Sequence, residues 1–311
     1  MNKKIAALVV TYNPEISRLQ INLENLKKQI NNVLVVDNGS MNISDVSDVC
    51  DVINVDLIKA GVNKGIATAQ NIGFNNLRVH DIEWVLTLDQ DSLLPNKTID
   101  AFRNSGKMED ESTGIIAISY YDRNWSEKQK RKFQYNGKNS IIEKDFTISS
   151  GNLVNIKAWE AVGGFDEFLF IDMVDYDFDA KLKLAGYKSW QLTNVFLNHE
   201  IGKVIHKPLL ETILFLPDKG RLADHSAFRQ YYIYRNSIIF YRRYPMFFKK
   251  RMLVLRTFLS TRRLFVYDHP IEKLKKAWKG IADGNRYNPV KDKQFQSRIS
   301  NCLKHKETLL K

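Results

Sequence analysis

Four groups of polar residues stand at or near the ends of predicted apolar strands in the first third of the chain. They are Thr11-Tyr12-Asn13, Asp37-Asn38, Asn63-Lys64-Gly65 and Asp89-Gln90-Asp91. Ligands bind parallel sheets beyond the carboxyl ends of the strands, so these groups are expected to converge. A single group of this kind is more often a turn or a helix cap. Four of them along one sheet edge favour a binding site.

The residue types in these groups match the chemistry of a nucleoside diphosphate. Asp37 can accept a hydrogen bond from a pyrimidine N–H, and the turn after Val10 can present backbone groups to the base. Lys64 can neutralise the charge of a diphosphate. Asp89 and Asp91 can hold a divalent hard cation whose other ligands are diphosphate oxygens and water.

A second set of acids lies between residues 172 and 179. Asp172, Asp175 and Asp179 are spaced to share one helical face if the helix extends back to Asp172, whereas Asp177 is offset. Clustered like charges raise the pKa of at least one carboxyl group, which suits a general base. The alternative is an acidic first turn that complements the helix dipole. We favour that alternative for Asp177 and Asp179, and catalysis for Asp175.

The elements that must position these residues alternate between strands and helices. This rhythm predicts an α/β fold with a mainly parallel, Rossmann-like sheet flanked by helices. Residues 122–145 are expected to form a polar hairpin or loop. Strands are predicted at 5–10, 33–36, 52–58, 84–88, 115–120, 188–192 and 203–206, and helices at 16–30, 65–77, from Pro95 onward, at 175–185 and beyond about 224.

Charge is unevenly distributed along the 311 residues, whose net charge is +12. Residues 201–311 hold 25 Lys and Arg against 8 Asp and Glu, a balance of +17, which leaves −5 for residues 1–200. The C-terminal region is also helical and rich in aromatic residues. It is expected either to lie on an anionic membrane surface or to pack as a helical bundle or dimer contact.

Composition excludes several classes of protein. The two cysteines, Cys50 and Cys302, are too few for a disulfide scaffold or a cysteine-rich zinc module and fit a reducing cytoplasm. No stretch approaches the roughly 18 apolar residues of a spanning helix. A nicotinamide-dependent oxidoreductase needs a glycine-rich turn after the first strand, and Thr11-Tyr12-Asn13-Pro14 contains no glycine.

The motifs taken together resemble family 2 glycosyltransferases of the GT-A fold, and the string Leu86–Ser92 is similar to bacterial rhamnosyltransferases. The resemblance covers roughly residues 5–245. Its motifs are Val9–Asn13, Val35–Ser40, Asn63-Lys64-Gly65 with Gln70–Gly73, Asp89–Ser92, Ser150–Leu153, Gly163–Glu167 and Asp172–Gly186.

The resemblance implies inverting sugar transfer from a nucleoside diphosphate donor with Mg²⁺ or Mn²⁺. It implies that Asp89 lies near the ribose and metal, that Asp91 is the main metal ligand, and that His199 completes the metal site, unless His199 is structural. Arg235 would reach a phosphate of the donor or acceptor. The implied nucleotide-sugar site contains Thr11, Tyr12, Asn13, Asp37, Asn38, Lys64, Asp89, Gln90 and Arg235.

The catalytic base implied by the resemblance is Asp175. Val174 stands where the family usually has Glu, and Asp172 adds an acid upstream, so the choice between Asp175 and Asp172 stays open. The implied domains are 1–222, with nucleotide-sugar binding at about 1–120 and the acceptor side at about 147–222, and the basic helical region 223–311.

The function expected from the resemblance is transfer of L-rhamnose from dTDP-β-L-rhamnose to a lipid-linked oligosaccharide of a capsule, O-antigen or wall polysaccharide. The protein would work in the cytoplasm, peripherally on the inner face of the membrane. Its basic C-terminal region would either contact that membrane or form a homodimer. A UDP-galactofuranose or other UDP-hexose transferase is the alternative. A nucleic-acid-binding protein is the alternative from another class, but it leaves the strand-end acids unexplained, so no nucleic acid partner is expected.

Overall fold

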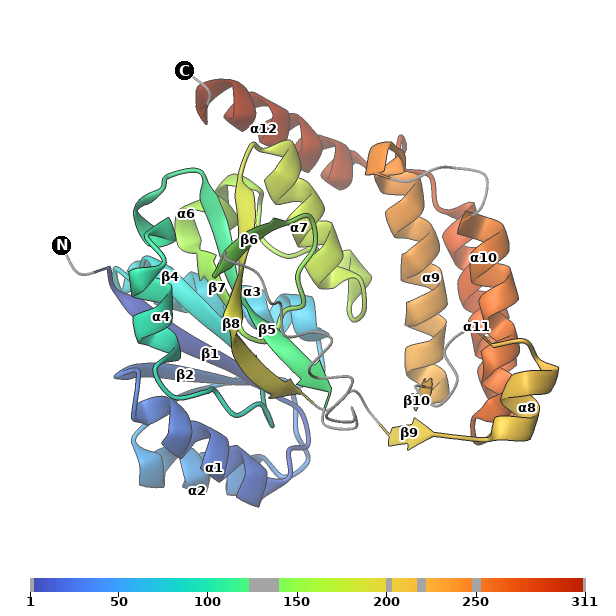
Figure 1. Ribbon diagram of the computed structural model, residues 1–311, viewed down its shortest axis with the longest axis horizontal. Coiled ribbons are helices and arrows are strands. Elements are labelled where there is room, and N and C mark those ends of the chain that lie inside the picture. The colour runs from blue at the N-terminus through green and yellow to red at the C-terminus, as the bar shows by residue number, and fades with distance from the viewer. Residues whose placement is uncertain (1–2, 123–139, 200–202, 217–221, 248–252, 310–311) are drawn as a thin grey trace. The chain divides into compact units, whose positions relative to one another are not determined.

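The central strands are continuous apolar runs, as expected where helices cover both faces of a sheet. The computed structural model describes residues 3–122, 140–199, 203–216, 222–247 and 253–309 (Figure 1). One eight-stranded sheet has the order β3-β2-β1-β4-β7-β5-β8-β6. Its strands are β1 (Ile5–Thr11), β2 (Asn32–Asp37), β3 (Asp56–Lys59), β4 (Trp84–Asp89), β5 (Thr113–Asp122), β6 (Ile141–Lys144), β7 (Asn152–Asn155) and β8 (Lys188–His199).

Strand direction divides this sheet into two parts. β3, β2, β1 and β4 are parallel to one another, as predicted. Beyond β4 the sheet is mixed, because β7 is antiparallel to β4 and β5, and β6 is antiparallel to β8. Only β5 and β8 form a parallel pair there. The α/β fold is confirmed, and its parallel part is the part that carries the strand-end motifs.

Several predicted element boundaries were wrong, among them the end of the strand predicted at 188–192, which continues as β8 to His199. The strand expected at 52–58 begins only at Asp56, because helix α2 (Ile43–Ile53) continues to Ile53 and ends at Asn54 in a left-handed conformation. Helix α4 (Thr98–Asn104) begins after Pro95, whose carbonyl accepts a hydrogen bond from the Thr98 hydroxyl. The polar segment 122–145 contains strand β6, and its residues 123–139 lie outside the described residues.

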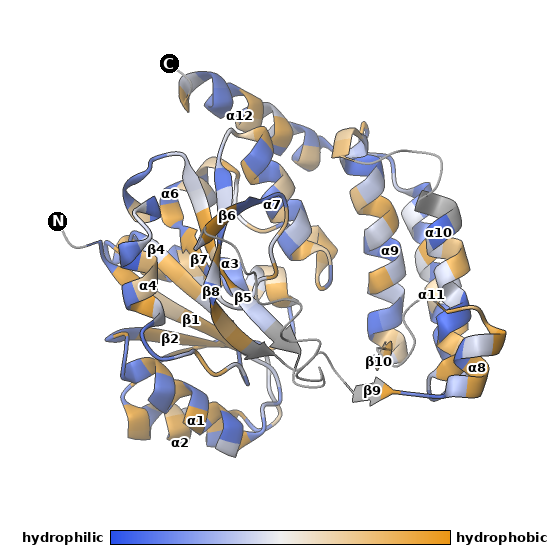
Figure 2. Ribbon diagram, viewed as in Figure 1, coloured by the Kyte–Doolittle hydropathy of each residue, from blue (hydrophilic) through white to orange (hydrophobic). Residues whose placement is uncertain are grey.

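Helices cover both faces of the sheet. α1 (Ile16–Lys27), α2 and α4 share a buried cluster with Ala7 and Val9 of β1, whereas α3 (Ile66–Val79) packs where Gly73 meets Leu8, which points to the opposite face. Ring contacts join α3 to α6 (Ile156–Ala161) and, through Phe165, to α7 (Val174–Leu184). The strands between these helices, β1, β2 and β4, are hydrophobic, as expected for a sheet that is covered on both faces (Figure 2).

The chain forms two compact units, Met1–Phe170 with Val174–His199 and Arg298–Lys311, and Ile171–Met173 with Glu200–Ser297. The division predicted from the sequence lay at residue 222, so residues 200–222 and 298–311 fall on the other side of it. Within the first unit, an ion pair of 3.0 Å joins Arg298 in the last helix to Asp166.

The second unit is mainly helical. Gly280 and Gly284 let α11 (Pro270–Arg286) approach α9 (Ala227–Arg243) closely, because a Cβ at Gly280 would lie 2.3 Å from the Tyr231 carbonyl oxygen. No helix among the described ranges is both long and apolar enough to cross a membrane. Its elements are β9 (Lys203–Ile205), α8 (Pro208–Ile213), β10 (Leu222–Asp224), α9 (Ala227–Arg243), η3 (Pro245–Phe247), α10 (Leu253–Ser260), η4 (Thr261–Val266), α11 (Pro270–Arg286) and the start of α12 (Lys293–Leu309).

Helix α7 is fixed in the first unit by a buried ion pair. Lys181 and Asp177 are each 1% exposed and lie 3.2 Å apart, one helical turn from each other. The same ammonium group donates to the Gly164 carbonyl at 2.6 Å. Two charges removed from water are stable only when they compensate each other. Asp177 is therefore structural, as the sequence predicted, and it sets the position of the helix that carries Asp175.

We expect Lys181→Met to lower the free energy of unfolding by about 3–5 kcal/mol, because it leaves the Asp177 carboxylate buried without its cation. Urea denaturation followed by tryptophan fluorescence measures the loss. The double variant Asp177→Leu with Lys181→Met is the control, since removing both charges should recover most of the stability. A loss below about 1 kcal/mol for Lys181→Met would show that the pair does not anchor α7.

Candidate active site

The register of the parallel strands brings three of the four predicted groups together. Thr11 pairs with Asp37 across β1 and β2, and Val10 pairs with Asp89 across β1 and β4. The carboxyl ends of these strands therefore stop level with one another at one edge of the sheet. The predicted convergence is present in the fold.

Asp37 is an almost fully buried acid at this edge, with 1% of the residue exposed. Its Oδ1 accepts from the hydroxyls of Thr11 at 2.9 Å and Ser40 at 2.5 Å. Its Oδ2 accepts from the backbone N–H groups of Gly39 at 3.1 Å and Ser40 at 2.9 Å. A carboxylate has about four acceptor positions, and four donors fill them. For Asp37 to accept a hydrogen bond from a pyrimidine base, one of these four donors must therefore be displaced. Thr11 is fully buried, so its hydroxyl positions the Asp37 carboxylate.

Asn38 ties the fourth group to the same edge. Its Oδ1 accepts from the Lys64 N–H at 2.9 Å, and its Nδ2 donates to Asn63 Oδ1 at 3.1 Å. Asn63 also accepts from the Gly65 N–H at 3.0 Å. The loop before α3 is thereby held at the end of β2, with Lys64 exposed. An exposed ammonium group on a braced loop is suited to an anionic ligand.

A second bridge joins the ends of β1 and β4. The Tyr12 N–H donates to Gln90 Oε1 at 2.9 Å, and Tyr12 is 47% exposed. Asn13, with φ 46°, donates through its N–H to the Ser40 hydroxyl at 2.8 Å and accepts from the Met41 N–H at 2.8 Å. Gln90 and Asn13 thus fix the backbone around Tyr12, which leaves the Tyr12 side chain at the surface of the predicted nucleotide site.

The backbone of Asp89 is held on both sides. Its N–H donates to the Ser150 hydroxyl at 3.1 Å, and its carbonyl accepts from Asn22 Nδ2 at 3.0 Å and the Ser92 N–H at 3.1 Å. Ser150 also donates to the Ser92 hydroxyl at 3.0 Å. Ser150 and Asn22 were missing from the predicted site, although the Ser150–Leu153 motif had pointed to this loop.

The donor set at the end of β4 fits a hard divalent cation. Asp89 and Asp91 are partly exposed carboxylates on one braced turn, and Mg²⁺ is commonly held by one or two carboxylates plus substrate phosphates and water. Within the described ranges no three His, Cys, Asp or Glu side chains form a metal-binding group. The side chain of His199 lies outside the described residues, so its role as a third ligand stays a prediction.

The acids of α7 take separate roles. Asp179 is fully buried and accepts from the Thr147 N–H at 2.6 Å. Burial raises the pKa of Asp179 well above its usual range, and the nearby Asp175 raises it further, whereas the bonds from Thr147 oppose the rise. Asp179 is therefore structural, but not through the predicted acidic first turn, because it lies buried beyond that turn. Asp175 is partly exposed in the first turn, and it lines one small cavity together with Asp179, Ser149 and Asn152.

Asp172 is not on the helix, so the predicted common face of Asp172, Asp175 and Asp179 was wrong. α7 begins at Val174, and Asp172 and Met173 both have φ 63°, a left-handed conformation that costs energy in residues other than glycine. In the second unit the Asp172 carboxylate accepts from Arg229 at 3.0 Å.

The segment 171–173 is also held through its backbone. Buried Asn236 donates from Nδ2 to the carbonyl groups of Ile171 at 2.7 Å and Asp172 at 3.1 Å. Arg229 and Asn236 were not among the predicted site residues, although the predicted Arg235 is the neighbour of Asn236 in the sequence. Arg235 itself donates to Asn236 Oδ1 at 3.0 Å, and its predicted phosphate contact stays a prediction.

Comparison with known proteins agrees with this geometry. A family model described as Glycosyl transferase family 2 matches residues 6–165. The dTDP-rhamnosyl transferase RfbF of Shigella flexneri is 31% identical over 307 residues, which are 93% of this chain and 100% of that protein.

Two solved structures share the fold. GalNAc-T7 with UDP, GalNAc and Mn²⁺ aligns with TM-score 0.55 and 10% identity over 96% of this chain and 56% of that one, so this chain spans little more than half of it. S. aureus TarS 1–349 in complex with UDP-GlcNAc aligns with TM-score 0.51 and 16% identity over 98% and 91%. The fold is that of GT-A glycosyltransferases, and the chain belongs to glycosyl transferase family 2 as an enzyme of sugar transfer.

Proposed function

We propose that the protein transfers L-rhamnose from dTDP-β-L-rhamnose, with inversion, to a lipid-linked oligosaccharide of a cell-surface polysaccharide. The observation that carries the proposal is the 31% identity to a dTDP-rhamnosyl transferase along the whole length of that protein. The two structural neighbours are named with UDP or a UDP-sugar, which keeps a UDP-hexose as the alternative donor. At 10% and 16% identity, however, they support only the fold.

In the proposed reaction, the acceptor hydroxyl attacks C1 of the donor sugar from the face opposite the nucleotide. The new bond joins C1 to the acceptor oxygen, the bond from C1 to the diphosphate breaks, and the hydroxyl proton passes to the Asp175 carboxylate. Asp89 and Asp91 would hold Mg²⁺ or Mn²⁺, which neutralises the leaving diphosphate when bound. Lys64 adds a positive charge from its braced loop.

Asp175 is better placed than Asp172 to act as the base. Two N–H groups of Arg229 occupy the Asp172 carboxylate in a forked pair, from Nε at 3.2 Å and Nη2 at 3.0 Å. Asp175 lies at the start of α7, partly exposed, and accepts a hydrogen bond from the Tyr176 N–H at 2.9 Å. We therefore assign proton acceptance to Asp175, and the shaping of the preceding turn to Asp172.

The donor and the metal can be tested together. We expect dTDP-β-L-rhamnose with Mg²⁺ or Mn²⁺ to raise the melting temperature more than UDP-galactofuranose does, and excess EDTA to remove the effect. Asp91→Ala should abolish metal-dependent stabilisation and transfer, because it removes a ligand from an otherwise intact turn. Asp48→Ala, an exposed acid of α2, is the control and should behave as wild type. Full activity in EDTA would refute the metal, and preference for a UDP-sugar would refute the donor.

The base is tested by Asp175→Asn, which is nearly isosteric and cannot take the proton. We expect kcat to fall about 10²–10⁴-fold, with little change in dTDP affinity, since other residues hold the donor. Wild-type activity should decline at low pH as the base becomes protonated, and the variant should lose that dependence. Asp172→Asn and Asp177→Asn should cost less. Near-normal kcat in Asp175→Asn together with a large loss in Asp172→Asn would move the base to Asp172.

A membrane-facing role of the tail is supported by exposed apolar side chains in the second unit. In α8 and the turn after it, Leu209, Ile213 and Phe215 are 76%, 60% and 80% exposed, whereas Leu216 is buried. The Phe215 carbonyl accepts from Arg262 Nη2 at 2.9 Å, which ties α8 to the basic segment of η4. Apolar side chains beside arginines on a region of charge +17 match an anionic bilayer surface. We propose that α8 and η4 contact the membrane on which a lipid-linked acceptor resides.

We expect the protein to bind vesicles containing anionic lipid and to release in high salt, because surface attraction is screened over about 8 Å at physiological ionic strength. Phe215→Glu should weaken this binding, since it places a carboxylate where an aromatic ring would enter the interface. Val52→Glu on α2, equally exposed at 80%, is the matched control and should bind as wild type. Equal binding to neutral and anionic vesicles would leave the tail as a packing or dimer element.

A further inference from the structure

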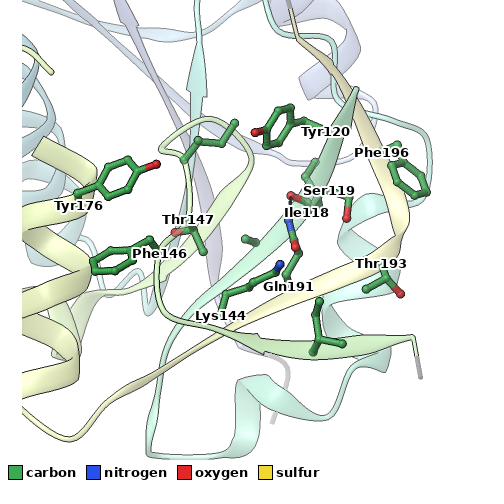
Figure 3. Close-up of a pocket in the computed structure, with 13 residues that line it drawn as sticks. Ile118, Ser119, Tyr120, Lys144, Phe146, Thr147, Tyr176, Gln191, Thr193 and Phe196 are labelled. Atoms are coloured by element: carbon green, nitrogen blue, oxygen red, sulfur yellow. Dashed lines mark hydrogen bonds between the residues drawn. The ribbon is translucent and has the colours of Figure 1, made fainter. Parts of the chain in front are cut away.

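A pocket of about 310 Å³ lies at β5, β6 and β8, which stand beyond β4 and β7 from β1 and β2 in the sheet. It is bounded by β5, β6, β8, the segment before β7 and the first turn of α7 (Figure 3). The predicted nucleotide residues lie at the ends of β1, β2, β3 and β4 or in the segments after them, apart from Arg235 on α9, and β7 separates β4 from β5 in the sheet. The pocket therefore lies on strands other than those that lead to the predicted nucleotide residues, and β8 is shared only with His199, the predicted third metal ligand. No predicted site residue lines the pocket.

Four aromatic side chains line the pocket. The rings of Phe146 and Tyr176 are stacked, with centroids 5.3 Å apart and planes at 24°. Tyr120 and Phe196 contribute two more rings, from β5 and β8. Aromatic faces are electron-rich and pair with C–H groups that carry partial positive charge, as on the apolar face of a sugar ring.

Polar groups complete the lining. Gln191 and Thr193 from β8 bring an amide and a hydroxyl, and Ser119 brings a second hydroxyl from β5 (Figure 3). Lys144 is the one cation among the described residues that line the pocket, and none of these residues is an acid. Rings for one face and neutral hydrogen-bonding groups for the edges suit a neutral saccharide, whereas a nucleoside diphosphate would need more positive charge.

The pocket is tied directly to the helix that carries the proposed base. Tyr176, in its wall, follows Asp175 in the sequence. Thr147, which also lines the pocket, donates its N–H to Asp179 at 2.6 Å, and Asp179 lies one turn after Asp175 on α7. A sugar ring held against Tyr176 would therefore present its hydroxyl groups beside the first turn of α7.

We propose that this pocket binds the terminal sugar ring of the acceptor, as a neutral saccharide. The inference rests on the proposed function, since only a transferase has an acceptor. Phe146 and Tyr176 hold the face of the ring, and Gln191 and Thr193 bind its hydroxyl groups. The pocket then selects the acceptor, whereas the predicted nucleotide site at the ends of β1, β2 and β4 selects the donor.

The test uses p-nitrophenyl glycosides of glucose, galactose, N-acetylglucosamine and rhamnose as probes, with binding to the full chain measured by ligand-observed NMR. Phe146→Ala removes one ring of the stacked pair, and affinity for the best-bound glycoside should fall about three- to tenfold. Gln191→Ala should act in the same direction, and it keeps the test decisive if Phe146→Ala fails to fold. Trp278→Ala, an exposed ring of α11 outside the pocket, is the matched control and should bind as wild type.

Three results would overturn the proposal: no glycoside bound by the wild type, unchanged affinity in both pocket variants, or a loss of dTDP affinity in those variants. The last would make the pocket part of the donor site. Rhamnosyl transfer to the same glycosides is assayed in parallel. If the wild type binds the glycosides but transfers nothing from dTDP-β-L-rhamnose, the proposed function fails, whereas unchanged binding in Phe146→Ala and Gln191→Ala counts against the pocket alone.

Discussion

The buried carboxylate of Asp37 imposes the constraint on which the predicted donor site depends. A buried charge must find donors for both oxygens, and here they come from Thr11, Gly39 and Ser40. Because Thr11 ends β1 and the other two form the turn after β2, this requirement fixes two strand ends at once. The adjacent Asn38 then holds the Lys64 loop. The polar edge is thus a set of mutually satisfied groups rather than a row of free side chains.

The acids in α7 and in the turn before it also have different partners. Asp177 is neutralised by Lys181, and Asp179 is held by Thr147, so both fix the helix. Asp175, one turn nearer the start, remains partly exposed. In the second unit, Arg229 and Asn236 stabilise the left-handed turn at 171–173 that precedes the helix. Strain of this kind persists only where surrounding contacts over-determine it, and α9 supplies those contacts.

Much of the fold could be read from local patterns, because an apolar run that ends in a turn is a strand signal wherever it occurs. β1, β2, β4 and α7 were predicted close to their actual ends. The strand at 52–58 was misplaced because Val46, Val49 and Cys50 place the apolar face of α2 on the core, so Val52 and Ile53 belong to the last turn of that helix and not to β3. The mixed directions of β6 and β7 carry no local signature, since pairing partners are chosen across the sheet.

Contiguous motifs were enough to predict the family, the polar groups at the strand ends and the acidic turn of α7. The structural roles of Asp172, Asp177 and Asp179 became visible only in the folded chain. Asp172 pairs with Arg229, 57 residues away, and the Asp89 backbone is held by Ser150, 61 residues away. The pocket beside Tyr176 likewise draws its walls from β5, β6 and β8. Local spacing reports only which residues share an element, whereas burial, ion pairing and hydrogen bonding depend on which distant element lies against them.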